Sequence, residues 1–205
     1  MHTVAFSSVT VVILTADSWQ SAALTFLLGS LSVWPVLSIL EKMSWYDKLV
    51  TQKTPGELKK SLTLFFAMLT LLVTVLWGIL KLPLLATASV LMWGTGDAAA
   101  ALVGIPFGKH KIPGRLSDGK KSWEGSLAMF LTAWICGYIV LRTGNQAALA
   151  SASGANVMGC RAAFHPVFCS ALGALAGTTA EFLTPGGLDT VTVPGCIAVV
   201  LALLH

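Results

Sequence analysis

Long apolar runs alternate with short polar segments along the chain. A helix needs about 20 mostly apolar residues to cross the hydrocarbon core of a bilayer, where only helices and closed barrels satisfy their backbone groups. The runs predict membrane helices over residues 22–40, 55–80, 84–103, 123–141, 165–183 and 191–204. The pattern therefore predicts an all-α fold, a polytopic transmembrane helical bundle of about 5–7 spans.

A single integral membrane domain is expected over residues 1–205, since no repeat or linker divides the apolar runs. An early apolar stretch at residues 4–14 and the last run at 191–204 are both short for a span. We therefore expect that the helices at both ends of the chain can be incomplete, and the number of spans is given as a range.

Basic residues gather in two of the polar segments. Of the thirteen Lys and Arg residues, five lie in residues 41–60 and five in residues 109–121. Two predicted spans separate these segments, so both lie on the same membrane face. Because cytoplasmic loops are enriched in Lys and Arg, that face is predicted to be cytoplasmic. A bacterial inner membrane, the endoplasmic reticulum and a plastid membrane all fit such a multi-pass protein.

Composition agrees with a membrane location. The chain is 55% hydrophobic and 11% charged with a mean hydropathy of +0.79, whereas soluble domains carry roughly 25% charged residues. The net charge is +4, but ten of the thirteen basic residues lie in two short loops between apolar runs, so no nucleic-acid partner is expected. The four cysteines form no CxxC pair and are predicted to be free thiols.

Capping residues mark the start of the second helix. Thr54, Pro55 and Glu57 match a capping box with proline at the first helical position, which predicts a helix beginning at Pro55. Lys59 and Lys60 would then lie on the turn that faces the lipid headgroups. We expect them to meet lipid phosphate or nucleotide there.

The segment from residue 94 to 126 is the candidate for chemistry. Asp97 stands among small and apolar residues, and a carboxylate at membrane depth costs about 2.5–3.5 kcal/mol, so it usually faces a polar cavity or a cation. The alternative is a carboxylate in a water-facing helix end. Residues 104–121 are predicted to be a cytoplasmic loop, in which glycines let the backbone approach a phosphate. His110 lies in this loop, either on a phosphate or solvated.

A predicted helix begins directly after this loop. Ser122 is a suitable N-cap, and Glu124 in the first turn complements the helix dipole. The N-terminus of a helix beside Lys120 and Lys121 is also a ready site for an anion.

Counting the crossings brings three distant acids to the face of the basic loop. Asp97, Glu181 and Asp189 all end up at this surface. Mg²⁺ takes one or two carboxylates together with phosphate oxygens, so acids mixed with lysines suit cation-bridged phosphates. Interfacial salt bridges between the same groups are the alternative.

The central motif resembles a known family. It runs through Gly96-Asp97-Ala98-Ala99-Ala100-Ala101-Leu102-Val103-Gly104, Phe107-Gly108-Lys109 and Lys121-Ser122-Trp123-Glu124-Gly125-Ser126. This order and spacing resemble the polyprenol kinase family of CTP-dependent dolichol, phytol and diacylglycerol kinases, which is distantly related to the phosphatidate cytidylyltransferases. Two other segments resemble the family more weakly. They are residues 54–59, and Glu181 together with residues 189–194. After Asp189 the family commonly has Asn, whereas this chain has Thr190.

The resemblance implies a CTP-dependent lipid kinase that transfers the γ-phosphoryl group of CTP to a polyprenol, phytol or diacylglycerol hydroxyl. It implies that the partners are CTP, the lipid alcohol and membrane lipids. It also implies that residues 104–121 form the loop that binds the nucleotide. The implied catalytic residues are Asp97, Glu124 and Asp189, and the implied Mg²⁺ ligands are Asp97, Glu181 and Asp189. The implied nucleotide contacts are Gly96, Gly104, Gly108, Lys109, Lys120, Lys121 and Ser122.

Two other functions stay open from the sequence. A cytidylyltransferase that makes a CDP-lipid would use the same kinds of groups. A small membrane transporter would have Asp97 line its pathway, but transporters bind near mid-membrane, whereas the polar residues here gather at one surface. Neither the lipid, the residue that takes the alcohol proton nor the oligomeric state follows from the sequence.

Overall fold

The computed structural model describes residue 12 and residues 15–43, 56–112, 121–150, 165–184 and 187–205. These residues form the helices α2 (Trp19–Leu40), α4 (Glu57–Leu72), η1 (Val73–Ile79, a π-helix), α5 (Pro83–Phe107), α6 (Trp123–Ala150), α7 (Pro166–Leu183) and α8 (Asp189–Leu203). Within the described ranges there is no strand, only an isolated bridge between Lys111 and Ser122.

Five of these helices are long and apolar enough to cross a membrane, counting α4 and η1 as one helix from Leu58 to Ile79, and α8 is a shorter apolar helix. Large apolar side chains remain exposed along α2, with Leu24 at 55%, Leu28 at 56% and Leu31 at 67%. Such a surface suits lipid contact rather than water. The prediction of an all-α, multi-pass membrane bundle is confirmed.

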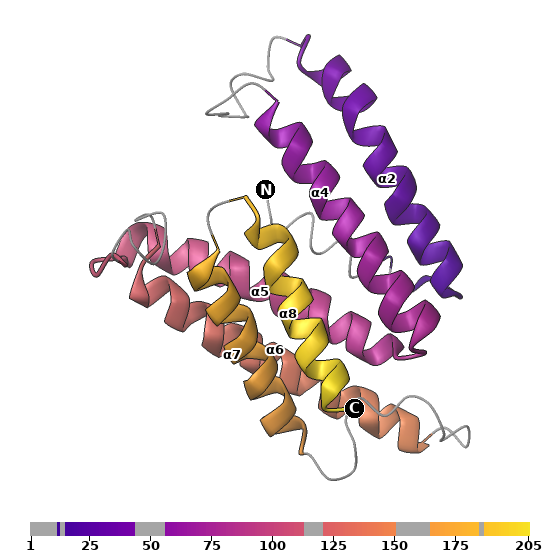
Figure 1. The fold of residues 1–205 in the computed structure, drawn as a ribbon, viewed down its shortest axis with the longest axis vertical. Coiled ribbons are helices and arrows are strands. Elements are labelled where there is room, and N and C mark those ends of the chain that lie inside the picture. Colours follow the sequence, from indigo (N-terminus) through magenta and orange to yellow (C-terminus); the bar gives the residue numbers. More distant parts are fainter. Residues whose placement is uncertain (1–11, 13–14, 44–55, 113–120, 151–164, 185–186) are drawn as a thin grey trace.

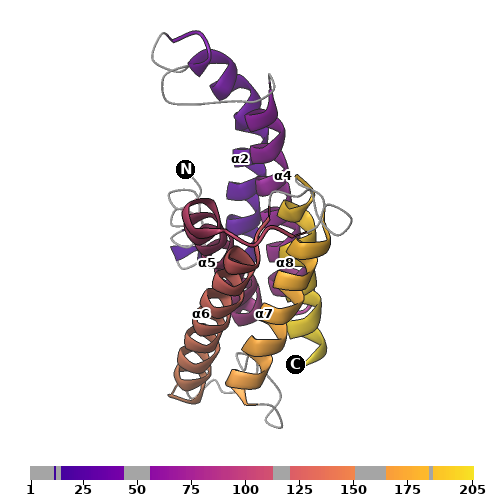
Figure 2. The same ribbon diagram turned by 90° about the vertical axis from the view of Figure 1, so that its left-hand side faces the viewer.

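The helices pack mainly with their neighbours in the chain. α5 packs against α6, α6 against α7, and α7 against α8, while α8 also contacts α5 and α4. α2 lies beside α4 and η1, and in Figure 1 the α2–α4 pair extends beyond the other helices. Figure 2 shows the end of α5, the start of α6, the end of α7 and the start of α8 on the same side of the molecule.

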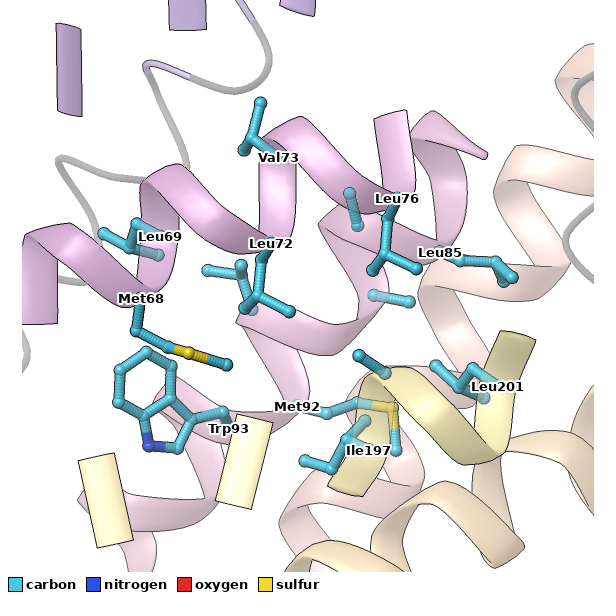
Figure 3. Close-up of a cluster of buried hydrophobic side chains, with 14 of the residues drawn as sticks. Met68, Leu69, Leu72, Val73, Leu76, Leu85, Met92, Trp93, Ile197 and Leu201 are labelled. Carbon is cyan, nitrogen blue, oxygen red and sulfur yellow. The ribbon is translucent and has the colours of Figure 1, made fainter. Parts of the chain in front are cut away.

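The core lies where α4, η1, α5 and α8 meet. Figure 3 shows Met68 and Leu72 of α4, Met92 of α5, and Ile197 and Leu201 of α8 packed together. In a bilayer, helices associate through close packing and small residues rather than through exclusion of water. Glycines of α6 and α7 make room for Met92, since a Cβ on Gly137 would lie 2.6 Å from its sulfur and one on Gly173 would lie 3.1 Å from its methyl carbon.

Several helix boundaries differ from the prediction. α5 continues to Phe107, so residues 104–107 are helical and do not belong to the loop expected at 104–121. Gly104 and Pro106 would ordinarily break a helix, but the packing of α6 against Gly104 supports this last turn. α6 continues to Ala150, although the predicted helix ended at residue 141.

The start of α4 also differs from the prediction. The helix begins at Glu57 rather than Pro55, because Gly56 adopts a left-handed conformation with φ of 79°. The expected capping residues Thr54 and Pro55 lie outside the described residues. α2 begins at Trp19, three residues before the predicted run, because the Ser18 hydroxyl accepts the N–H of Ser21 and caps the helix.

Candidate functional site

Two short segments pair at the end of α5 and the start of α6. The N–H of Ile112 donates to the carbonyl of Lys121 at 3.0 Å, and the N–H of Trp123 donates to the carbonyl of His110 at 3.1 Å. We call residues 108–112 and 121–124 the basic neck. Its pairing holds the exposed Lys109 and the half-buried Lys121 at one end of the bundle. Lys120 lies outside the described residues.

Ser122 joins the neck to α6. Its hydroxyl accepts the N–H of Gly125 at 3.2 Å, which confirms its predicted role as N-cap. The residue is only 3% exposed, because the neck and α5 enclose it. A Cβ on Gly108 would lie 2.6 Å from this hydroxyl and 2.3 Å from the carbonyl oxygen of Gly104. Only glycine fits at position 108 without moving the backbone.

Two further glycines of the motif, Gly96 and Gly104, lie inside α5 and pack against α6. A Cβ on Gly96 would lie 3.0 Å from the Met129 side chain, and one on Gly104 would lie 3.5 Å from the Cα of Gly125. Close helix packing accounts for glycine at both positions, including Gly104, which was expected to lie in a loop. Nucleotide contact by Gly96, Gly104 and Gly108 stays a prediction.

Lys121 links the neck to the end of α7. Its ammonium donates to the carbonyl of Thr184 at 2.9 Å and also to the carbonyl of Glu181. These carbonyls belong to the last turn of α7, where the helix dipole favours a cation. The side chain therefore ties two segments that are 60 residues apart in the sequence.

Two further carboxylates and this lysine act electrostatically on Glu181. Asp97 lies in α5, Glu181 in the last turn of α7, and Asp189 is the first residue of α8. The charges of Lys121, Asp97 and Asp189 all act on the Glu181 carboxylate. We call these four residues the acidic cluster. The structure thus brings together three of the acids and one lysine that the sequence placed at a single membrane face.

Glu181 is the least satisfied member of the acidic cluster. Its Oε2 atom is buried and has no hydrogen-bond partner among the described residues. A buried carboxylate oxygen without a partner is costly. Asp189 accepts the N–H of Thr190 at 2.9 Å, and Asp97 has an interaction partner of its own. An unpaired buried oxygen among carboxylates fits the binding of a hard cation.

No complete metal site is preformed in the part of the chain that the structure describes. A search of these residues finds no group of three or more His, Cys, Asp or Glu placed to hold an ion. The residues present fit a cation that is held by one or two carboxylates together with substrate phosphates. This kind of coordination is typical of Mg²⁺.

A threonine pair and a histidine contact were missed by sequence reasoning. The Thr184 and Thr192 hydroxyls lie 2.9 Å apart and join α7 to α8. His110 Nδ1 lies 2.7 Å from Glu124 Oε1, so the carboxylate that was expected to be catalytic is engaged by His110 within the neck. No motif or spacing signalled either contact, because each depends on tertiary folding.

Lys59 is held by protein groups rather than left open to a lipid phosphate or nucleotide. Its ammonium lies 2.7 Å from Glu41 Oε2 and 3.1 Å from the Ser38 hydroxyl, between α2 and α4. Its side chain is 11% exposed, so it is a structural group rather than a ligand contact. Lys60 remains exposed.

The helices and the acidic cluster define a multi-pass α-helical membrane protein with a charged site at one end of its bundle. Over 79 residues the chain is 35% identical to the phytol kinase of Synechocystis sp.. This segment covers 38% of the present chain and 33% of that kinase, so the chain spans about a third of its relative. No protein-family model matches the sequence. No solved structure matches it either.

Proposed function

We propose that this protein is a lipid kinase that transfers the γ-phosphoryl group of CTP to the hydroxyl of a membrane alcohol, such as a polyprenol, phytol or diacylglycerol. The observation that carries the proposal is the acidic cluster, in which the charges of Lys121, Asp97 and Asp189 act on the buried Glu181 carboxylate. The similarity to a phytol kinase supports a lipid alcohol as the acceptor.

Phosphoryl transfer depends mainly on positioning and on electrostatic stabilisation of the phosphate oxygens. Asp97, with Glu181 or Asp189, would hold Mg²⁺, which supplies positive charge to the nucleotide phosphates when bound. Lys121 would turn from the α7 carbonyls to a phosphate, and Lys109 would reach it from the other side of the neck. Lys120 is expected to contribute a third cation.

The location of the site suits a substrate that is anchored in the bilayer. Ile105 is 83% exposed and Phe107 is 66% exposed at the end of α5. These apolar side chains flank the basic neck, which would lie at the boundary between hydrocarbon and headgroups. A lipid alcohol would therefore keep its chain among them while its hydroxyl meets the nucleotide, on the face that we expect to be cytoplasmic.

The test is a transfer assay with protein reconstituted in liposomes and a panel of lipid alcohols. We expect radiolabel from γ-labelled CTP, but not from α-labelled CTP, to enter an organic-extractable product. Asp97→Asn should lower the rate at least about 100-fold. Asp17→Asn, which removes an exposed acid before α2, should leave the rate unchanged.

The labels separate the competing functions. Transfer of the α-label would indicate a cytidylyltransferase. Label transfer that is as fast in Asp97→Asn as in the wild type would remove the acidic cluster from the reaction. Solute flux without nucleotide, together with no labelled lipid, would instead support a transporter.

A further inference from the structure

A carboxylate–imidazole pair lies on the basic neck. Glu124 Oε1 lies 2.7 Å from His110 Nδ1 and also accepts the backbone N–H of His110 at 3.1 Å. An ionised carboxylate only accepts hydrogen bonds, so Nδ1 carries the proton of this contact. In the neutral ring, the lone pair is then on Nε2.

The ring is anchored on one side and open on the other. The His110 side chain is 79% exposed, whereas that of Glu124 is 27% exposed. No hydrogen bond from the described residues engages Nε2. On the anchored side, the His110 carbonyl accepts the N–H of Trp123, and Glu124 holds both the backbone and Nδ1. The pair therefore presents a fixed basic nitrogen to the outside.

The pair shares the basic neck with Lys121, which contacts the last turn of α7 at the proposed reaction site. Lys121, on the opposite segment of the neck, belongs to the acidic cluster and donates to the last turn of α7. The Trp123 ring packs against Phe182, with centroids 5.2 Å apart, directly beside Glu181. Exposed Phe107 and Trp123 give the same end of the bundle an apolar surface for a lipid.

We propose that His110 is the general base of the reaction and that Glu124 is its positioning residue. This inference rests on the proposed kinase function. The hydroxyl proton of the lipid alcohol passes to Nε2 as the alcohol oxygen bonds to the γ-phosphorus. The bond from that phosphorus to the β–γ bridging oxygen breaks, and CDP leaves. Glu124 stabilises the imidazolium, which then returns its proton to water.

Two substitutions of His110 test whether it acts as a general base or only holds the neck together through its contact with Glu124. In His110→Asn, the side-chain amide N–H takes the place of Nδ1–H, so the contact with Glu124 is kept while Nε2 is lost. In His110→Ala, both are lost. We expect either change to lower kcat roughly 100-fold, with KM for CTP within about twofold of the wild type. Imidazole added to His110→Ala should restore part of the lost rate.

The matched control is His165→Asn. His165 caps α7 by accepting the N–H of Val167, and asparagine is an equally good N-cap. This change should leave kcat unaltered. If His110→Asn turns over like the wild type while His110→Ala does not, the pair is only a clamp and the proposal is overturned.

A measurement without turnover separates this inference from the kinase assignment. Nitrogen NMR of histidine-labelled protein in micelles should show His110 with a protonated Nδ1 and an unprotonated Nε2. The signal is assigned by its loss in His110→Asn. The opposite tautomer would overturn the base assignment even in an active kinase. Wild-type protein that transfers no γ-label to any alcohol would instead overturn the kinase function, and the inference with it.

Discussion

At the scale of single residues, the charged side chains divide into two kinds. Lys59 is enclosed between α2 and α4, where it contacts Glu41, Ser38 and the face of Trp34, whose ring centre lies 5.5 Å from the ammonium. The groups of the acidic cluster lie instead at the end of the bundle, and the buried Glu181 oxygen there has no partner among the described residues. Lys59 therefore serves the fold, whereas we propose that the cluster binds a ligand.

This division predicts that a substitution of Lys59 lowers stability without affecting catalysis. Lys59→Ala removes a charge-assisted hydrogen bond and leaves Glu41 without this partner, so it should lower the free energy of unfolding by about 1.5–3 kcal/mol. Thermal unfolding in detergent, followed by thiol or tryptophan fluorescence, measures the change. Lys60→Ala, at the exposed neighbouring position, is the control. Equal effects of the two substitutions would contradict the structural role of Lys59.

At the scale of the helices, small residues decide how closely the elements approach. Gly137 of α6 and Gly173 of α7 both lie against Met92, which is fully buried. Gly195 of α8 has more space, since a Cβ there would lie 3.6 Å from Met68. Glycine is thus required by packing at some helical positions and tolerated at others.

The contrast gives a prediction of opposite sign at two glycines. Alanine is a better helix former than glycine by up to about 1 kcal/mol, so Gly195→Ala should be neutral or stabilising. Gly137→Ala places a Cβ 2.6 Å from the Met92 sulfur and should destabilise the bundle by about 1–3 kcal/mol despite the same gain in propensity. Unfolding midpoints of both variants in one detergent give the comparison. The packing account fails if Gly137→Ala is the more stable of the two.

At the scale of the whole molecule, the apolar runs predict the helices because the bilayer leaves little choice of backbone structure. The ends of the helices were harder to predict. Gly104 and Pro106 are residue types that often break helices, yet α5 continues through both, because α6 packs against its last turn. Counting crossings brought Asp97, Glu181 and Asp189 together. The partners of Lys121 and His110 could not be predicted, because they depend on tertiary contacts without a periodic signal.

The same crossing count makes a prediction about orientation. Lys109 on the neck and Lys60 at the start of α4 should face the cytoplasm, whereas Arg142 in the later part of α6 should face the other side, because α6 crosses the bilayer between Lys109 and Arg142. Cysteine introduced singly at each exposed position, in a chain whose native cysteines are replaced by alanine, reports the side by labelling with a membrane-impermeant maleimide. In intact bacterial cells only the cysteine at position 142 should react, and in inverted vesicles only those at 60 and 109. Reaction at 109 and 142 from one side would break the alternation on which the shared location of the acidic cluster and the basic neck depends.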